Sequence, residues 1–287
     1  MNHFLSRSWV LSVVLLSPLA WADQGLAKSK NMVSIRILQA VGPRNGQEWG
    51  TRFGFEAEKH PAYLTMALGA GSVTPIQMAV GYSVFANGGY RVDPWLITRV
   101  TDHKGRVLSE MQTPATEDHE RVIDARNAFI MNSLLQEITR SGTAARAQST
   151  LKRPDLFGKT GTTNDAVDAW FVGYQPTVVA AAWVGYDTPR NLGSRETGGG
   201  LSLPIWISYM QTALKDVPVA PYDPPPGVVN VGGEWYYEEY GPDRGVQSLG
   251  MQDPLPGQSP AGELPPGEQP RAPVIEDRRS ILDLFRN

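Results

Sequence analysis

Apolar residues recur at helical spacing in three segments of the chain. Val33, Ile37 and Val41 lie four residues apart, so one face of a helix would carry all three side chains. Gly42-Pro43 would stop this helix. The same spacing, with capping residues at the ends, predicts two further helices, between Thr74 and Asn87 and between Asp124 and Ser141. Residues 204–214 are expected to form a closing helix that packs on the strands.

After Pro154 the pattern changes from helical to extended. Segments 156–161, 169–174 and 178–185 are rich in β-branched and aromatic residues and are separated by turn residues, which predicts three antiparallel strands. A separate hairpin is expected where 96–101 and 106–109 flank a polar turn. Helices followed by a meander and one more helix predict an α+β fold, and no repeat of solenoid period is present.

The two ends of the chain differ from its middle. Arg7, an apolar stretch over 9–22 and Ala20-Trp21-Ala22 have the layout of a signal peptide, which predicts export to the periplasm or to the periplasmic face of the inner membrane. Thirteen of the 23 prolines lie at or beyond Pro218, which is typical of a disordered tail, although Trp235-Tyr236-Tyr237 is a candidate for docking. The expected division is a leader over 1–22, a domain over 25–216 and a largely disordered tail over 217–287.

Composition narrows the classes of function. A net charge of −3 and a pI near 5.9 argue against a nucleic-acid-binding protein. The chain has no cysteine, which excludes disulfides, cysteine-based zinc sites and a cysteine nucleophile. None of the histidines has the spacing of a metal site or a triad partner, so no role is assigned to them; they are His3, His60, His103 and His119.

Two short motifs carry the candidate chemistry. Ser29-Lys30-Asn31 stands at a predicted helix start, and Lys159-Thr160-Gly161-Thr162 stands on the first predicted strand, about 130 residues later. Their order and placement match the Ser-x-Asn and Lys-Thr-Gly elements of serine penicilloyl-type acyltransferases. With 68–75 and 168–174 as further context, residues 26–214 resemble the carboxy-terminal part of the transpeptidase domain of class A penicillin-binding proteins, which are bifunctional peptidoglycan synthases.

The resemblance implies a penicillin-binding transpeptidase or serine β-lactamase-like fold and an acyl transfer. In this family a serine attacks the bond between two D-alanines of a stem peptide, and the amine of a second stem peptide then takes the acyl group. The hydroxyl of Ser29 would lie between two lysine amines, of which Lys159 would be the second, and would pass protons to the leaving group. The implied ligands are the peptidoglycan stem peptide and β-lactams. No cofactor and no metal are implied, because the family's chemistry uses only side chains and backbone amides.

The resemblance also assigns substrate contacts. Asn31 would donate a side-chain hydrogen bond to the peptide, and Thr160 and Thr162 would hold its terminal carboxylate beside a positive charge. The peptide would lie along the strand as an added strand, and Gly161 would allow its backbone to approach. The backbone N–H of Thr162 would be one donor to the oxyanion.

Plainer roles stay open from the residues alone. Ser29 would serve equally as a helix N-cap, Lys159 as a surface lysine and Gly161 as the site of a bulge. Trp170 and Phe171 are expected in the core, and Asp165 and Asp168 at turns or caps.

The family's third motif, Ser-x-x-Lys, carries the nucleophile and precedes Ser-x-Asn, but only 28 residues precede Ser29. Ser149-Thr150-Leu151-Lys152 matches the letters, yet it follows in the wrong order and on a predicted loop. No nucleophile is therefore assigned, and the expectation is a domain truncated at its amino-terminal side, with an open sheet edge, inactive by itself. The alternatives are a non-catalytic secreted module that binds stem peptide or pairs with a full-length synthase, and a D,D-carboxypeptidase or β-lactamase.

Overall fold

The computed structural model describes residues 25–112, 121–194 and 196–241. The predicted leader and the end of the predicted tail lie outside these residues.

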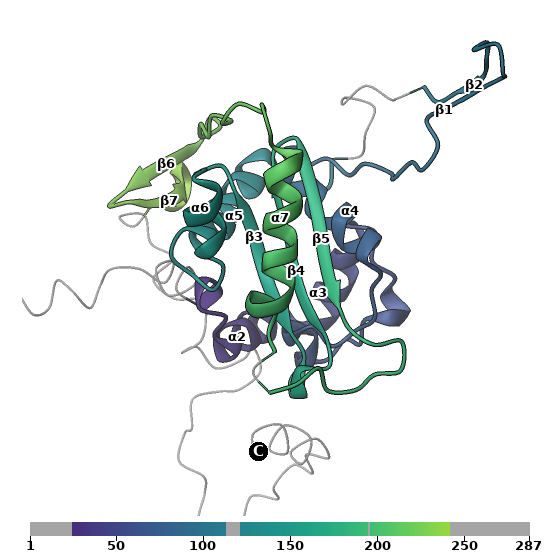
Figure 1. Cartoon of the computed structure of the whole chain (residues 1–287). Coiled ribbons are helices and arrows are strands. Elements are labelled where there is room, and N and C mark those ends of the chain that lie inside the picture. The colour runs from purple at the N-terminus through teal and green to yellow at the C-terminus, as the bar shows by residue number, and fades with distance from the viewer. Residues whose placement is uncertain (1–24, 113–120, 195, 242–287) are drawn as a thin grey trace, which may run out of the picture. The chain divides into compact units, whose positions relative to one another are not determined.

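A three-stranded antiparallel sheet stands at the centre of the fold (Figure 1). Its strands are β3 (Phe157–Thr162), β4 (Ala169–Gln175) and β5 (Val178–Val184), in that order. This confirms the predicted meander. The register places Gly161 opposite Trp170 and Trp170 opposite Trp183, so these three residues share one face of the sheet.

The predicted helices are all present. They are α2 (Asn31–Val41), α4 (Pro75–Ala86), α5 (Ala125–Arg140) and α7 (Leu203–Ala213). Thr74 and Gln77 form a reciprocal capping box at the start of α4, and the Asp124 carboxylate accepts the Arg126 N–H at the start of α5.

Two helices were not expected. Gly42-Pro43 ends α2, as predicted, but it also begins α3 (Pro43–Thr51), because proline suits the first turn of a helix. Helix α6 (Arg146–Leu151) occupies part of the stretch expected to be a loop. The short helical turns are η1 (Ala57–Lys59), η2 (Leu64–Leu68), η4 (Asn164–Ala166), the π-helical η5 (Gly198–Ser202) and η6 (Glu238–Tyr240).

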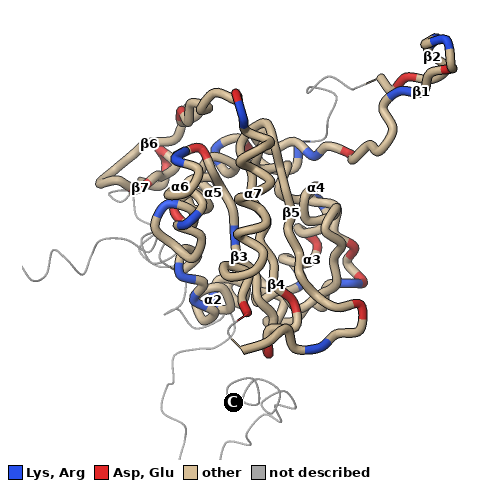
Figure 2. Tube along the Cα trace, viewed as in Figure 1, with Lys and Arg blue, Asp and Glu red and all other residues tan. Residues whose placement is uncertain are grey.

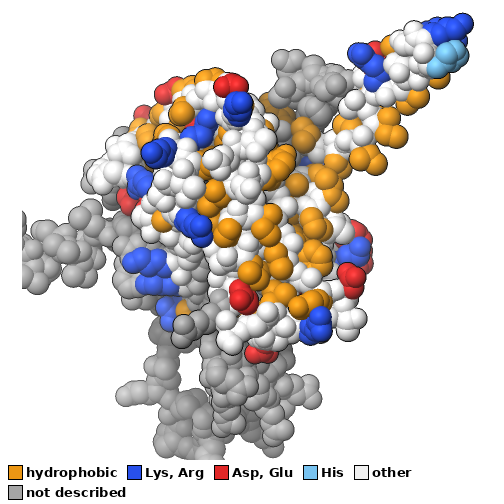
Figure 3. All heavy atoms as spheres, viewed as in Figure 1, with side chains coloured by type: hydrophobic (Ala, Val, Ile, Leu, Met, Phe, Trp, Pro, Cys, Tyr) orange, Lys and Arg blue, Asp and Glu red, His pale blue; other side chains and the backbone are white. Residues whose placement is uncertain are grey.

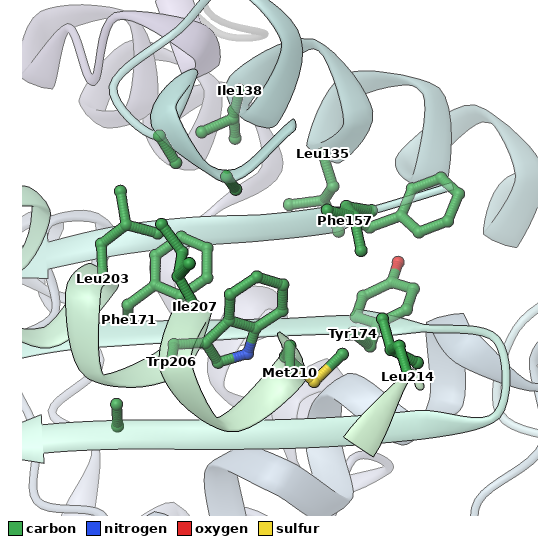
Figure 4. Packing of buried hydrophobic residues seen from close by; sticks show 14 of the residues in the cluster. Leu135, Ile138, Phe157, Phe171, Tyr174, Leu203, Trp206, Ile207, Met210 and Leu214 are labelled. Atoms are coloured by element: carbon green, nitrogen blue, oxygen red, sulfur yellow. The ribbon is translucent and has the colours of Figure 1, made fainter. Parts of the chain in front are cut away.

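The two faces of the sheet pack against different helices. Helix α7 covers one face, where the Trp206 ring lies 4.9 Å from that of Phe171 (Figure 4). On the opposite face Phe157 stacks on Tyr174 at 5.1 Å, and α4 and α5 pack there. Burial of these large side chains is the main driving force that holds the three layers together.

Charge is almost absent from this central part. Strands β4 and β5 and helices α4 and α7 contain no Asp, Glu, Lys or Arg, and Lys159 is the one such residue in β3 (Figure 2). A single ammonium on an otherwise uncharged sheet has a cost in desolvation, which only pairing or hydrogen bonding can offset.

Two hairpins complete the described residues. The predicted one pairs β1 (Arg99–Thr101) with β2 (Val107–Glu110). The other pairs β6 (Val228–Val231) with β7 (Glu234–Tyr237). Within the expected tail, residues 217–241 are therefore described and include regular structure. Trp235 packs edge-on against Phe129 of α5 at 4.9 Å, as the docking expectation for 235–237 required.

Candidate active site

Ser29 lies in a tight turn rather than at a helix cap. Its backbone N–H donates to the Leu26 carbonyl at 3.1 Å, and the next N–H, of Lys30, donates to the Gly25 carbonyl at 2.7 Å. The N-cap of α2 is Lys30, so the capping alternative for Ser29 is wrong. Ser29 itself has a φ of 50°, in the left-handed region that non-glycine residues rarely adopt. Such strain is found where surrounding structure fixes a side chain in place, and functional sites are common examples.

Lys159 faces this turn from β3. Its Nζ donates to Oγ of Ser29 and, at 2.9 Å, to the carbonyl of Thr160. Burial lowers the pKa of the Lys159 ammonium from 10.5 to about 8, because the charged form loses solvation. Lys159 is therefore not an ordinary surface lysine, since burial brings its pKa much closer to neutral.

A cleft of about 1330 Å³ opens beside these two groups. All the residues predicted to form the site line it, namely Ser29, Asn31, Lys159, Thr160, Gly161 and Thr162. Helix α2 contributes Asn31 and β3 contributes the four consecutive positions, so two segments far apart in the sequence meet at one surface.

The hydroxyls of β3 are held by neighbouring segments. Thr160 Oγ1 lies 2.8 Å from Thr143 Oγ1, and Thr162 Oγ1 accepts the Gly198 N–H at 3.0 Å. A Cβ added to Gly161 would lie 3.2 Å from the Trp170 Cβ, so the absence of a side chain there serves packing within the sheet. Strand β3 keeps its regular register through this glycine, so the bulge alternative is wrong.

Two tryptophans of the cleft were missed from the sequence. Phe171 is fully buried, as expected, but Trp170 lines the cleft instead of the core. Adjacent residues of a strand point to opposite faces, and this alternation was the signal that could have separated them. Trp183 lies beside Trp170, with ring centres 5.9 Å apart, and also lines the cleft.

The aspartates after β3 act in turns, as expected. Asp165 has a φ of 58° inside η4. The Asp168 N–H donates to Thr163 Oγ1 at 2.7 Å, and the Asp168 carboxylate accepts from Trp183 Nε1 at 2.8 Å. Asp168 therefore also fixes the orientation of a cleft residue. His60, which had no assigned role, lines the cleft as well.

The Ser149-Thr150-Leu151-Lys152 match lies elsewhere. Ser149 belongs to α6, not to a loop, and its hydroxyl donates to the Arg146 carbonyl at 3.2 Å. Neither Ser149 nor Lys152 is among the residues that line the cleft. The described residues contain no cluster of three or more His, Asp or Glu side chains suited to a metal ion, and none of their helices is long and apolar enough to cross a membrane.

A small antiparallel sheet between helices, with a hydroxyl–amine pair beside its edge strand, fits the Ser-x-Asn and Lys-Thr-Gly elements of penicillin-binding acyltransferases. The family described as "Penicillin binding protein transpeptidase domain" matches residues 18–206, and the chain belongs to this family.

Individual relatives agree with this assignment. Penicillin-binding protein 1A of Neisseria flavescens is 50% identical over 217 residues, which cover 75% of this chain and 27% of the relative. The protein of the same name from Pseudomonas aeruginosa is 38% identical over 312 residues, covering 91% and 38%. The crystal structure of penicillin-binding protein 1A from Haemophilus influenzae matches with a TM-score of 0.68 and 32% identity, over 75% of this chain and 39% of that one. The chain thus spans between a quarter and two fifths of the length of these relatives.

Proposed function

We propose that this chain provides the proton-transfer and substrate-binding half of a D,D-transpeptidase site that cross-links peptidoglycan stem peptides. The observation that carries the proposal is the hydrogen bond from Lys159 Nζ to Ser29 Oγ at the edge of the cleft. Membership of the penicillin-binding transpeptidase family supports the same chemistry.

In this proposal Ser29 and Lys159 move the proton of the acyl transfer. With the pKa of Lys159 at about 8, amine and ammonium are both populated near neutral pH, so the group accepts and returns a proton with little energy difference. The Ser29 hydroxyl both donates and accepts, which lets it pass that proton toward a leaving or attacking amine. No described residue is assigned as the nucleophile, which would have to border the same cleft.

The substrate would lie along the outer edge of β3. Among the described residues β3 pairs only with β4, so its other edge is open to an added strand. Asn31 would donate its amide to the peptide, and the hydroxyls of Thr160 and Thr162, near the Lys159 ammonium, would hold the terminal carboxylate. A β-lactam, whose carboxylate lies next to its reactive amide, would occupy the same positions.

Peptide binding tests this proposal without requiring turnover. Isothermal titration of the full chain with diacetyl-L-Lys-D-Ala-D-Ala should show binding, and Lys159→Met and Thr160→Val should each weaken it about tenfold. Thr212→Val, on the exposed side of α7, is the control and should bind as the parent does. Equal binding of the diastereomer that ends in L-Ala-L-Ala would contradict a D,D-specific site.

Labelled penicillin separates the enzyme classes. The proposal expects no covalent band on a gel from this chain alone, because no residue of its cleft is assigned as the nucleophile. A band that disappears in Ser149→Ala would instead assign the nucleophile to α6. Release of free D-alanine from the peptide would favour a D,D-carboxypeptidase.

We also propose that the domain acts in the periplasm after export directed by residues 1–22. A fusion of the chain to a reporter that is active only outside the cytoplasm should lose its signal when residues 2–22 are deleted. An unchanged signal would rule out this role for the leader.

A second candidate is a non-catalytic module that pairs with a full-length synthase. The observation that favours it is the far edge of β5, which has no partner strand among the described residues and contains neither charge nor proline. Apolar side chains also gather over α7 and β5 on one face of the molecule (Figure 3), where Ile205 and Tyr209 are exposed. Co-purification with such a synthase, lost on Ala181→Lys and Ala182→Pro in β5, would support the module.

A further inference from the structure

Thr143 occupies a corner where three parts of the active site meet. It follows α5 in the segment Ser141-Gly142-Thr143 and lines the cleft. It belongs to neither of the two sequence motifs, yet its side chain contacts Thr160 in the second motif. Its carbonyl lies 3.3 Å from the position of a Cβ added to Gly199, in the π-helical turn beside β3.

The same corner holds the turn that carries Ser29. The Thr143 N–H donates to the Ala27 carbonyl at 3.1 Å, two residues before Ser29. Ala27 is buried, and a Cβ on Gly142 would lie 2.5 Å from its carbonyl oxygen, so glycine is required for the two segments to approach. The backbone of Thr143 is therefore fixed relative to the Ser29 turn, and its hydroxyl has a defined position.

That hydroxyl is paired with the hydroxyl of Thr160 at 2.8 Å, and either oxygen can be the donor. An anion at Thr160 removes this freedom. A carboxylate only accepts hydrogen bonds, so Thr160 must donate its proton to the carboxylate, and Thr143 must then donate to Thr160 Oγ1. A chain of hydroxyls polarised in one direction strengthens each of its hydrogen bonds.

We propose that Thr143 is a positioning residue for carboxylate recognition, which orients the Thr160 hydroxyl toward the terminal carboxylate of the peptide. The inference rests on the proposed function, because it requires that the site bind a peptide carboxylate. It adds a residue outside both motifs whose contribution depends on the charge of the ligand. A residue with a merely structural role would affect charged and neutral ligands alike.

The test compares two forms of one peptide on the full chain. Diacetyl-L-Lys-D-Ala-D-Ala and its C-terminal amide are titrated calorimetrically against the parent, Thr143→Val and Thr143→Ser. We expect Thr143→Val to weaken binding of the acid about fivefold, the effect of one lost hydrogen bond, and to leave the amide unchanged. Thr143→Ser, which keeps the hydroxyl, should bind the acid within about twofold of the parent.

The other possible outcomes separate the role of Thr143 from the proposed carboxylate site. Equal loss for acid and amide in Thr143→Val, or no loss for either, overturns the role of Thr143 while the proposed function stands. A parent chain that binds acid and amide equally well overturns the proposed carboxylate site and this inference with it. If circular dichroism shows Thr143→Val to be unfolded, Thr143→Ala replaces it, since the smaller side chain fits the same space.

Discussion

Lys159 donates a hydrogen bond to the hydroxyl of Ser29, a residue 130 positions earlier in the chain. The lysine projects from a strand of an uncharged sheet, and the serine is held in a left-handed turn. Each residue is in an unfavourable state by itself, because the Lys159 amine is desolvated and the Ser29 backbone is strained. Their meeting explains both, since the two groups form one hydrogen-bonded pair at the edge of the cleft.

The lowered pKa of Lys159 predicts a pH-dependent stability. In the unfolded chain this amine keeps its proton up to about pH 10.5, whereas in the folded chain it releases it near pH 8. Between these values the unfolded state binds more protons, so the free energy of unfolding should rise as the pH increases from 8. Urea denaturation between pH 7.5 and 9.5 measures this, and Lys159→Met should remove the rise.

The rise in stability with pH should end near pH 10 for a separate reason. Burial raises the pKa of Tyr82 from 10 to about 12, so above pH 10 the unfolded chain loses tyrosine protons first and stability falls again. A stability that falls between pH 8 and 9.5 in the parent would contradict the assignment for Lys159.

Asp155 and Arg153 form the ion pair whose loss should matter most. Burial raises the pKa of Asp155, but hydrogen bonds from Arg153, the Ala220 N–H and Gln175 outweigh burial and hold it below its usual value. The Asp155 carboxylate and the Arg153 side chain are 2% and 12% exposed, so removing one charge leaves the other buried. Asp155→Asn should reduce the free energy of unfolding at pH 7 by about 3–5 kcal/mol.

The pH dependence of that variant checks the cause. A carboxyl with a lowered pKa contributes stability above its unfolded pKa of 3.8, and this contribution is lost as the pH falls through the lower folded value. The difference between parent and Asp155→Asn, measured by urea denaturation, should therefore shrink below pH 3.8. Glu56→Gln, in the exposed pair with Lys59, is the control and should change the urea midpoint far less.

Gly198 should tolerate no side chain. An added Cβ would lie 2.2 Å from the Trp170 carbonyl oxygen and 2.4 Å from that of Gly161. Both are backbone atoms of the sheet, which cannot move aside as a flexible side chain does, so Gly198→Ala should lower the melting temperature by several degrees. Gly50→Ala is the matched control, because nothing lies within 4 Å of its Cβ and the residue is helical. It should be neutral or slightly stabilising.

Helix α7 should contribute to the stability of the fold through only one of its faces. Trp206 is 1% exposed and packs on Phe171, whereas Tyr209, three residues later, is 55% exposed. Trp206→Ala should reduce the free energy of unfolding by about 3–5 kcal/mol, and Tyr209→Ala should change it by less than about 0.5 kcal/mol. Similar losses in the two variants would show that the outer face of α7 is also covered.

The sequence pattern predicted the helices and strands that are fixed by residues a few positions apart. Helices α4 and α5 begin at Thr74 and Asp124 because each side chain accepts a backbone N–H that the helix leaves unpaired. Gly42-Pro43 was less decisive, since the same two residues end one helix and begin the next. The hairpin β6–β7 escaped the prediction because its proline-rich surroundings resemble a tail, and it depends on docking to Phe129.

The sequence by itself determined helices α2, α4, α5 and α7, the meander and the two motifs, because spacing, caps and turn residues act within a few positions. The tertiary structure decided which residues meet. It placed Trp170 in the cleft and Phe171 in the core, since α7 packs over Phe171 while the opposite face of the sheet is open to the cleft at Trp170. It also brought Thr143 into contact with Thr160. No local pattern predicts this contact, because it depends on the close approach that Gly142 allows between the backbone after α5 and that of Ala27.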